Sequence, residues 1–157
     1  MNRRLKCGAA IACCLWPLGA QAVVALCNVS ASGVAFANYV SMAGGNTDGL
    51  GDVAVTCTAI GSAGTGTYTI TLGTGSGSYA NRTLVSGGHA LNYNLYLDTA
   101  RMLTWGDGSA GSGIVSDSYQ MVLTPTTRHY TVFGRIPGAQ NQPAGIYLDA
   151  LVVTVTY

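Results

Sequence analysis

Few residues of this chain have the side-chain chemistry of a catalytic or metal-binding site. His89 and His129 are the only histidines, and the 157-residue sequence contains no glutamate. No G-x-S-x-G motif places a serine on a nucleophile turn, and the abundant serines lie in glycine-rich stretches. Two isolated histidines are more often structural than metal ligands. We therefore predict that the protein is not an enzyme and has no catalytic residues and no metal site.

Two glycine-rich stretches have only a superficial similarity to ligand loops. Gly73–Ser78 (GTGSGS) contains no lysine and precedes no helical pattern, unlike a phosphate-binding loop. Gly106–Gly113 (GDGSAGSG) contains a single aspartate, Asp107, whereas calcium loops need several at alternating positions. Both stretches are interpreted as turns, in which Asp107 accepts hydrogen bonds from backbone amides. No cofactor is expected.

The first 22 residues have the three parts of a secretory signal peptide. These parts are a basic start, an apolar segment and a small-residue cleavage site: Arg3, Arg4 and Lys6; Ala9–Leu18; Ala20-Gln21-Ala22. A lipoprotein signal ending at Cys13 or Cys14 is the alternative, but it would have a very short apolar segment. Cleavage after Ala22 leaves residues 23–157 as one exported domain, with no integral membrane segment.

The charge composition of residues 23–157 restricts the class of protein further. This part has four arginines and six aspartates, a formal net charge of −2, and neither lysine nor glutamate. Lysine and glutamate are common on exposed helices, so their absence argues against a helical protein. Nucleic-acid binding requires clustered cations, which the sequence does not provide. A charge-poor surface of this kind favours self-association.

The cysteines predict one disulfide. Cys27 and Cys57 are the two that remain after signal cleavage, and a pair of cysteines in an exported chain is normally oxidised. In the chain-entropy view, closing a loop of about 30 residues stabilises a fold by about 3–4 kcal/mol.

Period-2 patterns separated by glycine-rich turns indicate an all-β fold. In Ala90–Asp98, for example, Leu91, Tyr93, Leu95 and Leu97 are expected to point inward, and Asn92, Asn94 and Tyr96 outward. Eight short strands at close spacing predict a sandwich of immunoglobulin type. They are expected at Val29–Phe36, Asp52–Ala59, around Thr67–Leu72, Asn81–Val85, Ala90–Asp98, Tyr119–Thr124, Thr127–Ile136 and Ile146–Tyr157.

Four segments together resemble the spore coat protein U family, which includes the Csu-type subunits of archaic chaperone–usher pili. They are CNVSASGVAFANY (27–39), VTCTA (55–59), LNYNLYLDTARMLTWGDGSAG (91–111) and VFGRIPGAQNQPAGIYLDALVVTVTY (132–157). The tyrosine-rich YNLYLD, the WGDG turn and the G-x-Y-x-D ending are specific in combination. Ala37-Asn38 departs from the glycine that usually follows the phenylalanine.

The resemblance implies an incomplete immunoglobulin-like β-sandwich that lacks one strand. In such pilins a periplasmic pilus chaperone lends a strand during export. The N-terminal extension of another pilin subunit replaces it in the fibre, which assembles at an outer-membrane usher. The chain is then expected to pass through the periplasm of a Gram-negative bacterium to a cell-surface fimbrium. Its expected role there is structural or adhesive, in surface attachment and biofilm formation.

On this interpretation, the last strand is the edge that accepts the strand of a partner. Its expected acceptor residues are Tyr147, Leu151, Val153, Val155 and Tyr157. The segment before Cys27 is the possible donor, namely Val23, Val24, Ala25 and Leu26. Four residues span at most about 14 Å, less than a full donor strand. Either the segment past Cys27 joins the donor, or the subunit accepts a strand without giving one. The second option is favoured and would place the subunit at the fibre tip.

Apolar residues near the glycine-rich loops are candidates for an exposed adhesive surface. Trp105, beside Met102 and Leu103, is expected in the core, although an adhesive patch is the alternative. Ile114 and Val115, within a polar loop, are the better candidates for an exposed apolar tip. Two other functions remain open from the sequence: a secreted spore-coat or cell-surface matrix protein, and a secreted ligand-binding β-sandwich module.

Overall fold

The structure is a computed structural model that describes residues 24–42 and 44–157. The predicted signal peptide, residues 1–22, and the donor candidate Val23 lie outside the described residues. The described part contains no helix, and therefore none long and apolar enough to span a membrane.

The described residues form nine strands, which confirms the all-β prediction. Regular alternation of β-branched and polar residues produces most of them, and glycine-rich turns separate them. The strands are β1 (Val24–Phe36), β2 (Thr47–Ile60), β3 (Gly64–Leu72), β4 (Ser76–Gly77), β5 (Arg82–Ser86), β6 (His89–Tyr96), β7 (Val115–Met121), β8 (Thr126–Ile136) and β9 (Val153–Thr156).

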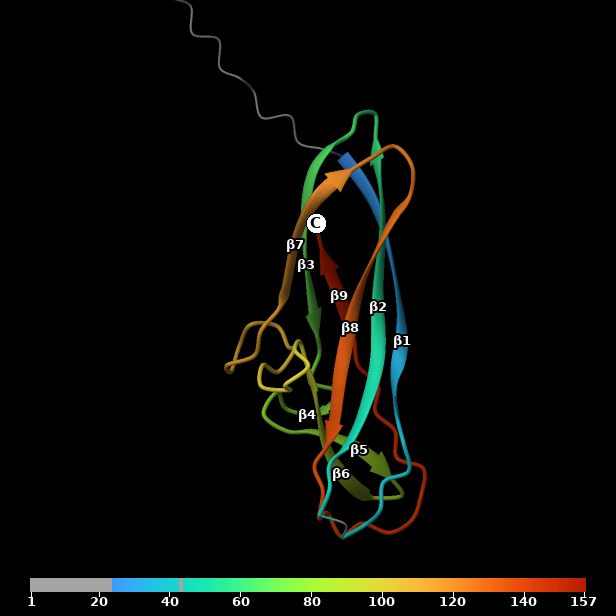
Figure 1. Ribbon diagram of the computed structural model, residues 1–157, viewed down its shortest axis with the longest axis vertical. Coiled ribbons are helices and arrows are strands. Elements are labelled where there is room, and N and C mark those ends of the chain that lie inside the picture. The colour runs from blue at the N-terminus through green and yellow to red at the C-terminus, as the bar shows by residue number, and fades with distance from the viewer. Residues whose placement is uncertain (1–23, 43) are drawn as a thin grey trace, which may run out of the picture.

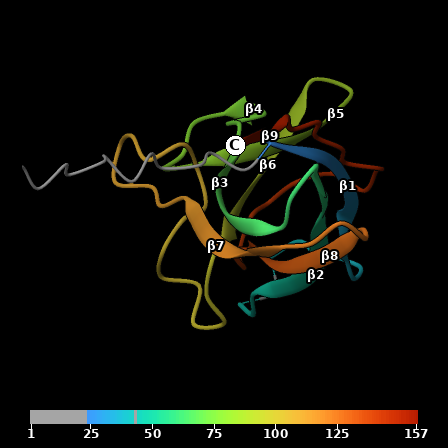
Figure 2. The ribbon, with the colours of Figure 1, turned by 90° about the horizontal axis from the view of Figure 1, so that it is seen from above.

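Two sheets pack against each other as a sandwich of immunoglobulin type (Figures 1 and 2). Within the described chain, one sheet has the order β1-β2-β8-β6-β5-β4 and the other has the order β7-β3-β9. All pairings between these strands are antiparallel. β1 and β9 each lie at the end of their sheet, so each has one edge without a partner among the described strands.

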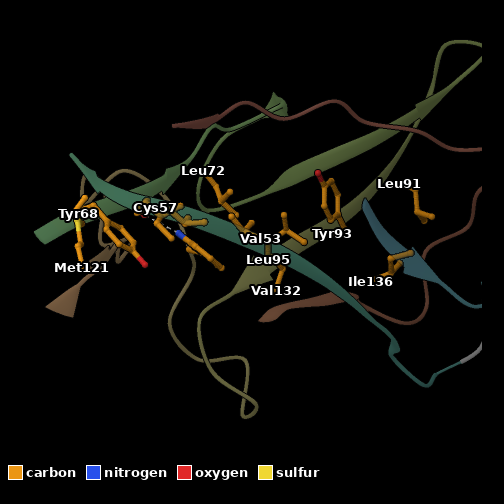
Figure 3. Packing of buried hydrophobic residues seen from close by; sticks show 14 residues of the cluster. Val53, Cys57, Tyr68, Leu72, Leu91, Tyr93, Leu95, Met121, Val132 and Ile136 are labelled. Carbon is orange, nitrogen blue, oxygen red and sulfur yellow. Dashed lines mark hydrogen bonds between the residues drawn. The ribbon is translucent and has the colours of Figure 1, made fainter. Parts of the chain in front are cut away.

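The core lies between the sheets and consists of alternate residues of the long strands (Figure 3). β2, β3 and β6 each contribute every second side chain, as period-2 patterns predict. These side chains include Val53, Val55, Cys57, Tyr68, Ile70, Leu72, Leu91, Tyr93 and Leu95. Trp105 is fully buried, and its indole N–H donates to the Ile70 carbonyl over 3.1 Å. The prediction that Trp105 belongs to the core is confirmed.

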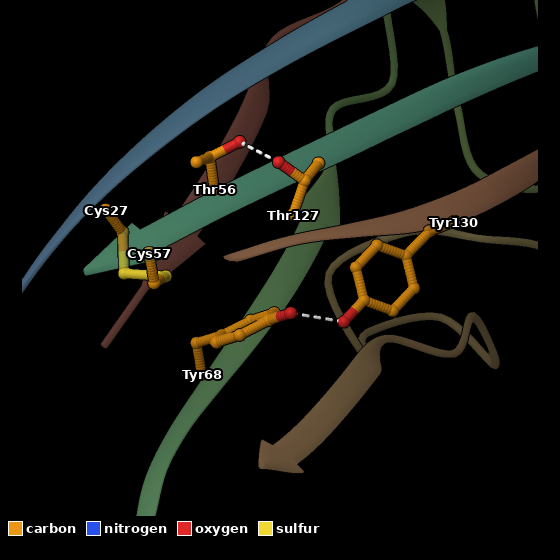
Figure 4. Close-up of a disulfide and its surroundings, with 6 residues drawn as sticks. All are labelled: Cys27, Thr56, Cys57, Tyr68, Thr127 and Tyr130. Carbon is orange, nitrogen blue, oxygen red and sulfur yellow. Dashed lines mark hydrogen bonds between the residues drawn. A yellow bond between two sulfur atoms is a disulfide. The ribbon is translucent and has the colours of Figure 1, made fainter. Parts of the chain in front are cut away.

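Cys27 and Cys57 form the predicted disulfide, which joins β1 to β2 (Figure 4). The two residues lie directly opposite each other in the antiparallel pair. Beside them, the hydroxyls of Thr56 and Thr127 lie 2.8 Å apart and link β2 to β8. The disulfide therefore ties the edge strand β1 to the centre of its sheet.

The C-terminal strand is shorter than its apolar pattern predicts. Regular pairing covers only Val153–Thr156, whereas a strand was expected over Ile146–Tyr157. The preceding residues contact the neighbouring strands at isolated points, through Leu148 to Val85 and Val152 to Gly73. β-propensity does not produce a continuous ladder here, because a ladder needs a partner along its whole length.

Asn94 is another correction to the predicted pattern. Alternation places it on the outer face of β6, but it is 7% exposed. Its amide nitrogen donates to the Tyr79 carbonyl over 2.8 Å, and its side-chain oxygen accepts a 2.6 Å hydrogen bond from Arg82. The buried guanidinium of Arg82 needs polar acceptors, and Asn94 is one of them.

Tyrosines close the sandwich near the disulfide. The hydroxyls of Tyr68 on β3 and Tyr130 on β8 are hydrogen-bonded (Figure 4). Tyr130 in turn donates to the Asp117 carboxylate on β7 over 2.5 Å. Burial and the hydrogen bond with Tyr130 raise the pKa of Tyr68 above its ordinary value. Burial, followed by the hydrogen bond to Asp149, likewise raises the pKa of Tyr93.

These pKa shifts predict a loss of stability in alkali. Since the folded protein keeps protons that unfolded tyrosines release, the free energy of unfolding should fall as the pH rises through the ordinary tyrosine pKa of about 10. Denaturant titrations between about pH 8 and about pH 11 measure this change. Tyr68→Phe should reduce the slope, whereas Tyr157→Phe, which alters an exposed side chain, should not. A free energy of unfolding that stays constant over this range contradicts the prediction.

Candidate functional site

A large apolar groove lies between the second half of β1 and the C-terminal segment. Its volume is about 1160 Å³, and its lining comes from residues 31–41, residues 142–153 and the facing core. Apolar side chains dominate the lining, among them Val34, Phe36, Leu91, Tyr93, Leu95 and Leu151. The groove therefore interrupts the sandwich at the position where the two sheets would meet.

In the described chain, one wall of the groove is the free edge of β1, and the other is the C-terminal segment, of which only Val153–Thr156 is a regular strand. On one side, β1 is bonded to β2 by its inner edge. On the other side, the C-terminal segment is held from behind by hydrogen bonds between Val85 and Leu148, by the Gly73–Val152 hydrogen bond and by pairing of β9 with β3. Within the described chain, no strand occupies the space between these walls. Edge strands of this kind present unpaired N–H and C=O groups that can bind another strand.

The two walls run in opposite directions. β1 descends in Figure 1, while the C-terminal segment rises towards β9. A strand placed between them would be antiparallel to one wall and parallel to the other.

The predicted acceptor residues lie in three different environments. Tyr147, Leu151 and Val153 are half-buried and line the groove. Val155 is half-buried against the core but does not line the groove. Tyr157 is 61% exposed and lies outside the lining. The accessible part of this wall therefore ends at Val153, the first residue of β9.

Asp149 is the single charged residue of the groove lining in the described structure. The Tyr93 hydroxyl donates to its Oδ2 over 2.6 Å, and the Ser76 amide donates to its Oδ1 over 2.9 Å. Both carboxylate oxygens therefore have partners within the chain. The rest of the lining is uncharged and mainly apolar, and it is suited to the aliphatic side chains of an extended segment.

The described residues of the possible donor segment are already paired within the chain. Val24, Ala25 and Leu26 belong to β1 and pair with Ile60, Ala59 and Thr58 of β2. To act as a donor, this segment would have to leave its own sheet. Sequence reasoning did not anticipate this pairing, because β1 was expected to begin only at Val29.

The two residues proposed for an apolar tip have different environments. Val115 begins β7, lies opposite Ile70 and packs against the core. Ile114 is 38% exposed and ends the long loop after β6. The same loop exposes Met102 (85%) and Leu103. Asp98 holds them in place by accepting hydrogen bonds from both of their amides.

The two histidines lie on separate strands and share no site. His89 begins β6, and the Nδ1 atom of His129 on β8 lies 2.8 Å from Asp52. Among the described residues, no group of three or more histidine, cysteine or acidic side chains is arranged to hold a metal ion.

Sequence reasoning assigned no role to the wall formed by β1. Val34, Phe36 and Tyr39 line the groove, although only the C-terminal wall was anticipated. Their apolar character was visible in the predicted strand Val29–Phe36. Only the tertiary fold, however, places that strand opposite the C-terminal segment.

Comparison with known proteins relates the chain to a protein family, to a curated relative and to solved structures. A sequence profile described as the Spore Coat Protein U domain matches residues 18–154. Protein U of Myxococcus xanthus is 34% identical over 67 residues, which cover 43% of this chain and 34% of that protein.

One of the similar solved structures is the crystal structure of the CsuC–CsuE chaperone–tip adhesion subunit pre-assembly complex from the archaic chaperone–usher Csu pili of Acinetobacter baumannii. It matches with a TM-score of 0.57 and 18% identity, over 85% of this chain and 40% of that chain. The present chain thus spans less than half the length of either relative, and the structural match supports the fold.

Proposed function

Because the chain belongs to the Spore Coat Protein U domain family, we propose that it is a non-catalytic structural subunit of a chaperone–usher pilus whose groove accepts a β-strand from another polypeptide. The observation that carries this proposal is the apolar groove between the free edge of β1 and the oppositely directed C-terminal segment. A strand inserted there would satisfy the backbone groups of both walls and cover the exposed core.

The energy of such an insertion is large compared with the stability of a domain. About four apolar side chains buried by a donated strand contribute about 6–12 kcal/mol of transfer free energy. Whole domains are stable by only about 5–15 kcal/mol. We therefore expect the free subunit to be marginally stable and prone to aggregation, and the complemented subunit to be stable.

The proposed partners follow from this need for a strand. They are a periplasmic pilus chaperone, an outer-membrane usher and other pilin subunits, and the proposed destination is a fimbrium on the cell surface. The matched crystal structure is itself a complex of a chaperone with a tip adhesion subunit, which supports the chaperone as the first partner.

A place at the fibre tip is part of the proposal. Since Val24, Ala25 and Leu26 are already paired with β2, the subunit is better suited to accept a strand than to give one. The exposed loop that carries Met102, Leu103 and Ile114 supports a role in surface attachment and biofilm formation.

A spore-coat or cell-surface matrix protein is the second candidate. The 67-residue match to Protein U of Myxococcus xanthus favours it. The same groove would then link subunits in a layer rather than in a fibre. Electron microscopy of cells that produce the chain distinguishes thin fibres from an amorphous layer.

Strand binding can be tested with two neighbouring substitutions. Leu151 lines the groove, whereas Val152 is 70% exposed and does not. Leu151→Arg places a charge in the apolar groove, so it should weaken binding of a strand by about 10-fold or more. The probe is a synthetic peptide of about ten residues in which valine alternates with threonine, a length that matches the walls. Binding is measured by calorimetry and by the rise in melting temperature.

Val152→Arg is the matched control and should leave peptide affinity unchanged. The wild-type chain should also gain soluble yield when a pilus chaperone is co-produced in the periplasm. A wild-type chain that is a stable monomer alone, and that binds neither peptide nor chaperone, would exclude the proposed function.

A further inference from the structure

The two walls of the groove meet at one end. Just after the C-terminal end of β1, the Ser41 hydroxyl donates to the Gln140 carbonyl over 3.1 Å, and the Gln142 amide donates to the Ser41 hydroxyl over 3.1 Å. The Gln140 amide also donates to the Tyr39 hydroxyl over 2.7 Å. We call this set of contacts between residues 39–42 and 138–142 the clasp. Tyr39, Ser41 and Gln142 also line the groove, so the clasp is part of its end.

Gln140 anchors the clasp to the core sheet. Its side-chain oxygen accepts a 2.8 Å hydrogen bond from the Asn92 amide, and its side-chain nitrogen donates to the Asn92 carbonyl over 2.9 Å. The side chain of Gln140 thereby bonds the backbone of β6 as a strand neighbour would. These two hydrogen bonds hold Gln140, and with it the clasp, against β6.

Close packing and unusual backbone conformations mark the same place. A Cβ atom on Gly138 would lie 2.5 Å from the Gly45 carbonyl oxygen, so the two loops can approach only with glycine at this position. Met42 and Ala139 have positive φ angles of 65° and 61°, a region that non-glycine residues rarely adopt. Such conformations persist only where the surroundings enforce them, and they are common at binding sites.

We propose that the clasp is a stop that closes one end of the groove and sets how far a partner's β-strand enters. The partner is an extended apolar segment of another chain, so this inference rests on the proposed function. Since the walls are hydrogen-bonded to each other at the clasp, a strand lying between them must end there. The opposite end, beside Ala31 and Val153, has no such contact between the described walls. The clasp would thus determine the register of the partner.

The test uses the alternating valine–threonine peptide with a small folded protein fused, without a linker, to either its N-terminus or its C-terminus. The fusion whose added domain meets the clasp should bind the wild-type chain at least about 10-fold more weakly than the other fusion. Weaker binding of the C-terminal fusion indicates that the strand lies antiparallel to the C-terminal wall. Weaker binding of the N-terminal fusion indicates that it lies parallel to that wall. Either asymmetry supports the stop.

Variants of the clasp separate this explanation from other causes of asymmetry. Gln140→Ala and Gly138→Ala should open the end and reduce the difference between the two fusions to about threefold or less. Ser41→Ala, which removes a single hydroxyl, covers the case in which the other two variants fail to fold. Gln120→Ala on β7, far from the groove, is the control and should retain the full difference.

Two outcomes overturn the inference in distinguishable ways. Equal binding of both fusions to the wild-type chain, or an asymmetry that every folded clasp variant retains, refutes the stop but leaves strand binding intact. Failure of the unfused peptide and of a pilus chaperone to bind refutes the proposed function, and the stop with it.

Discussion

Replacing Arg82 by methionine is expected to lower the free energy of unfolding by about 3–5 kcal/mol. Arg82 is fully buried, and in the described structure none of its hydrogen bonds is made to a carboxylate. Its guanidinium donates to the Gly73 carbonyl over 2.8 Å, to the Trp105 carbonyl over 2.7 Å and to the Asn94 side chain over 2.6 Å. One cation thus ties together three parts of the chain.

The size of the expected effect follows from what the substitution leaves behind. Methionine fills a similar volume, but it leaves the Gly73 and Trp105 carbonyls without the donors that Arg82 supplies. The side-chain oxygen of Asn94 keeps only its hydrogen bond from the Leu95 amide. Each hydrogen bond from a charged donor is worth about 1.5–3 kcal/mol, and water entering the site would recover part of the loss. Because total domain stability is about 5–15 kcal/mol, the variant should be largely unfolded unless a strand fills the groove.

Chemical denaturation of the chain in complex with a chaperone or peptide provides the measurement. The free energy of unfolding of Arg82→Lys should lie between those of Arg82→Met and the wild type. One ammonium group cannot reach all three acceptors as a planar guanidinium does. Arg135→Met, which breaks only an exposed ion pair with Asp48, is the control and should cost less than about 1 kcal/mol. Equal effects of Arg82→Met and Arg135→Met would show that the buried network contributes nothing.

Removal of the disulfide should have the second largest effect. The double variant Cys27→Ala, Cys57→Ala is expected to lose about 3–4 kcal/mol, because the bond closes a loop between residues 30 positions apart. Alanine is preferred to serine at these positions, because Cys57 is fully buried and a serine hydroxyl there would lose its hydrogen bonds to water. The loss should be concentrated in β1, the edge strand that forms one wall of the groove.

The redox dependence of unfolding identifies the cause of this loss. A thiol reductant should lower the denaturation midpoint of the wild type towards that of the double variant, and it should not change the double variant. Hydrogen exchange should show faster opening of β1 than of β3, both in the reduced wild type and in the double variant. Identical midpoints for the oxidised wild type and the double variant would contradict the prediction.

The sequence by itself determined the features that depend on local pattern and on covalent chemistry. Period-2 alternation identified the strands and the inward positions of residues such as Val53, Leu91 and Leu95, because successive side chains of a strand point to opposite faces. The number of cysteines left after signal cleavage was enough to pair Cys27 with Cys57. The apolar Trp105 before a Gly-Asp-Gly turn was correctly placed in the core.

Only the tertiary structure decided which edges lack partners and which polar groups are buried. Local pattern is the same for a paired and an unpaired strand, so Ile146–Tyr157 looked like one continuous strand although only Val153–Thr156 has a ladder. Val24, Ala25 and Leu26 looked free, but their apolar side chains extend β1. Asn94 is buried because Arg82, distant in sequence, needs acceptors, and the clasp joins loops about 100 residues apart. These outcomes arise from contacts between distant segments, which the periodicity of a single segment does not contain.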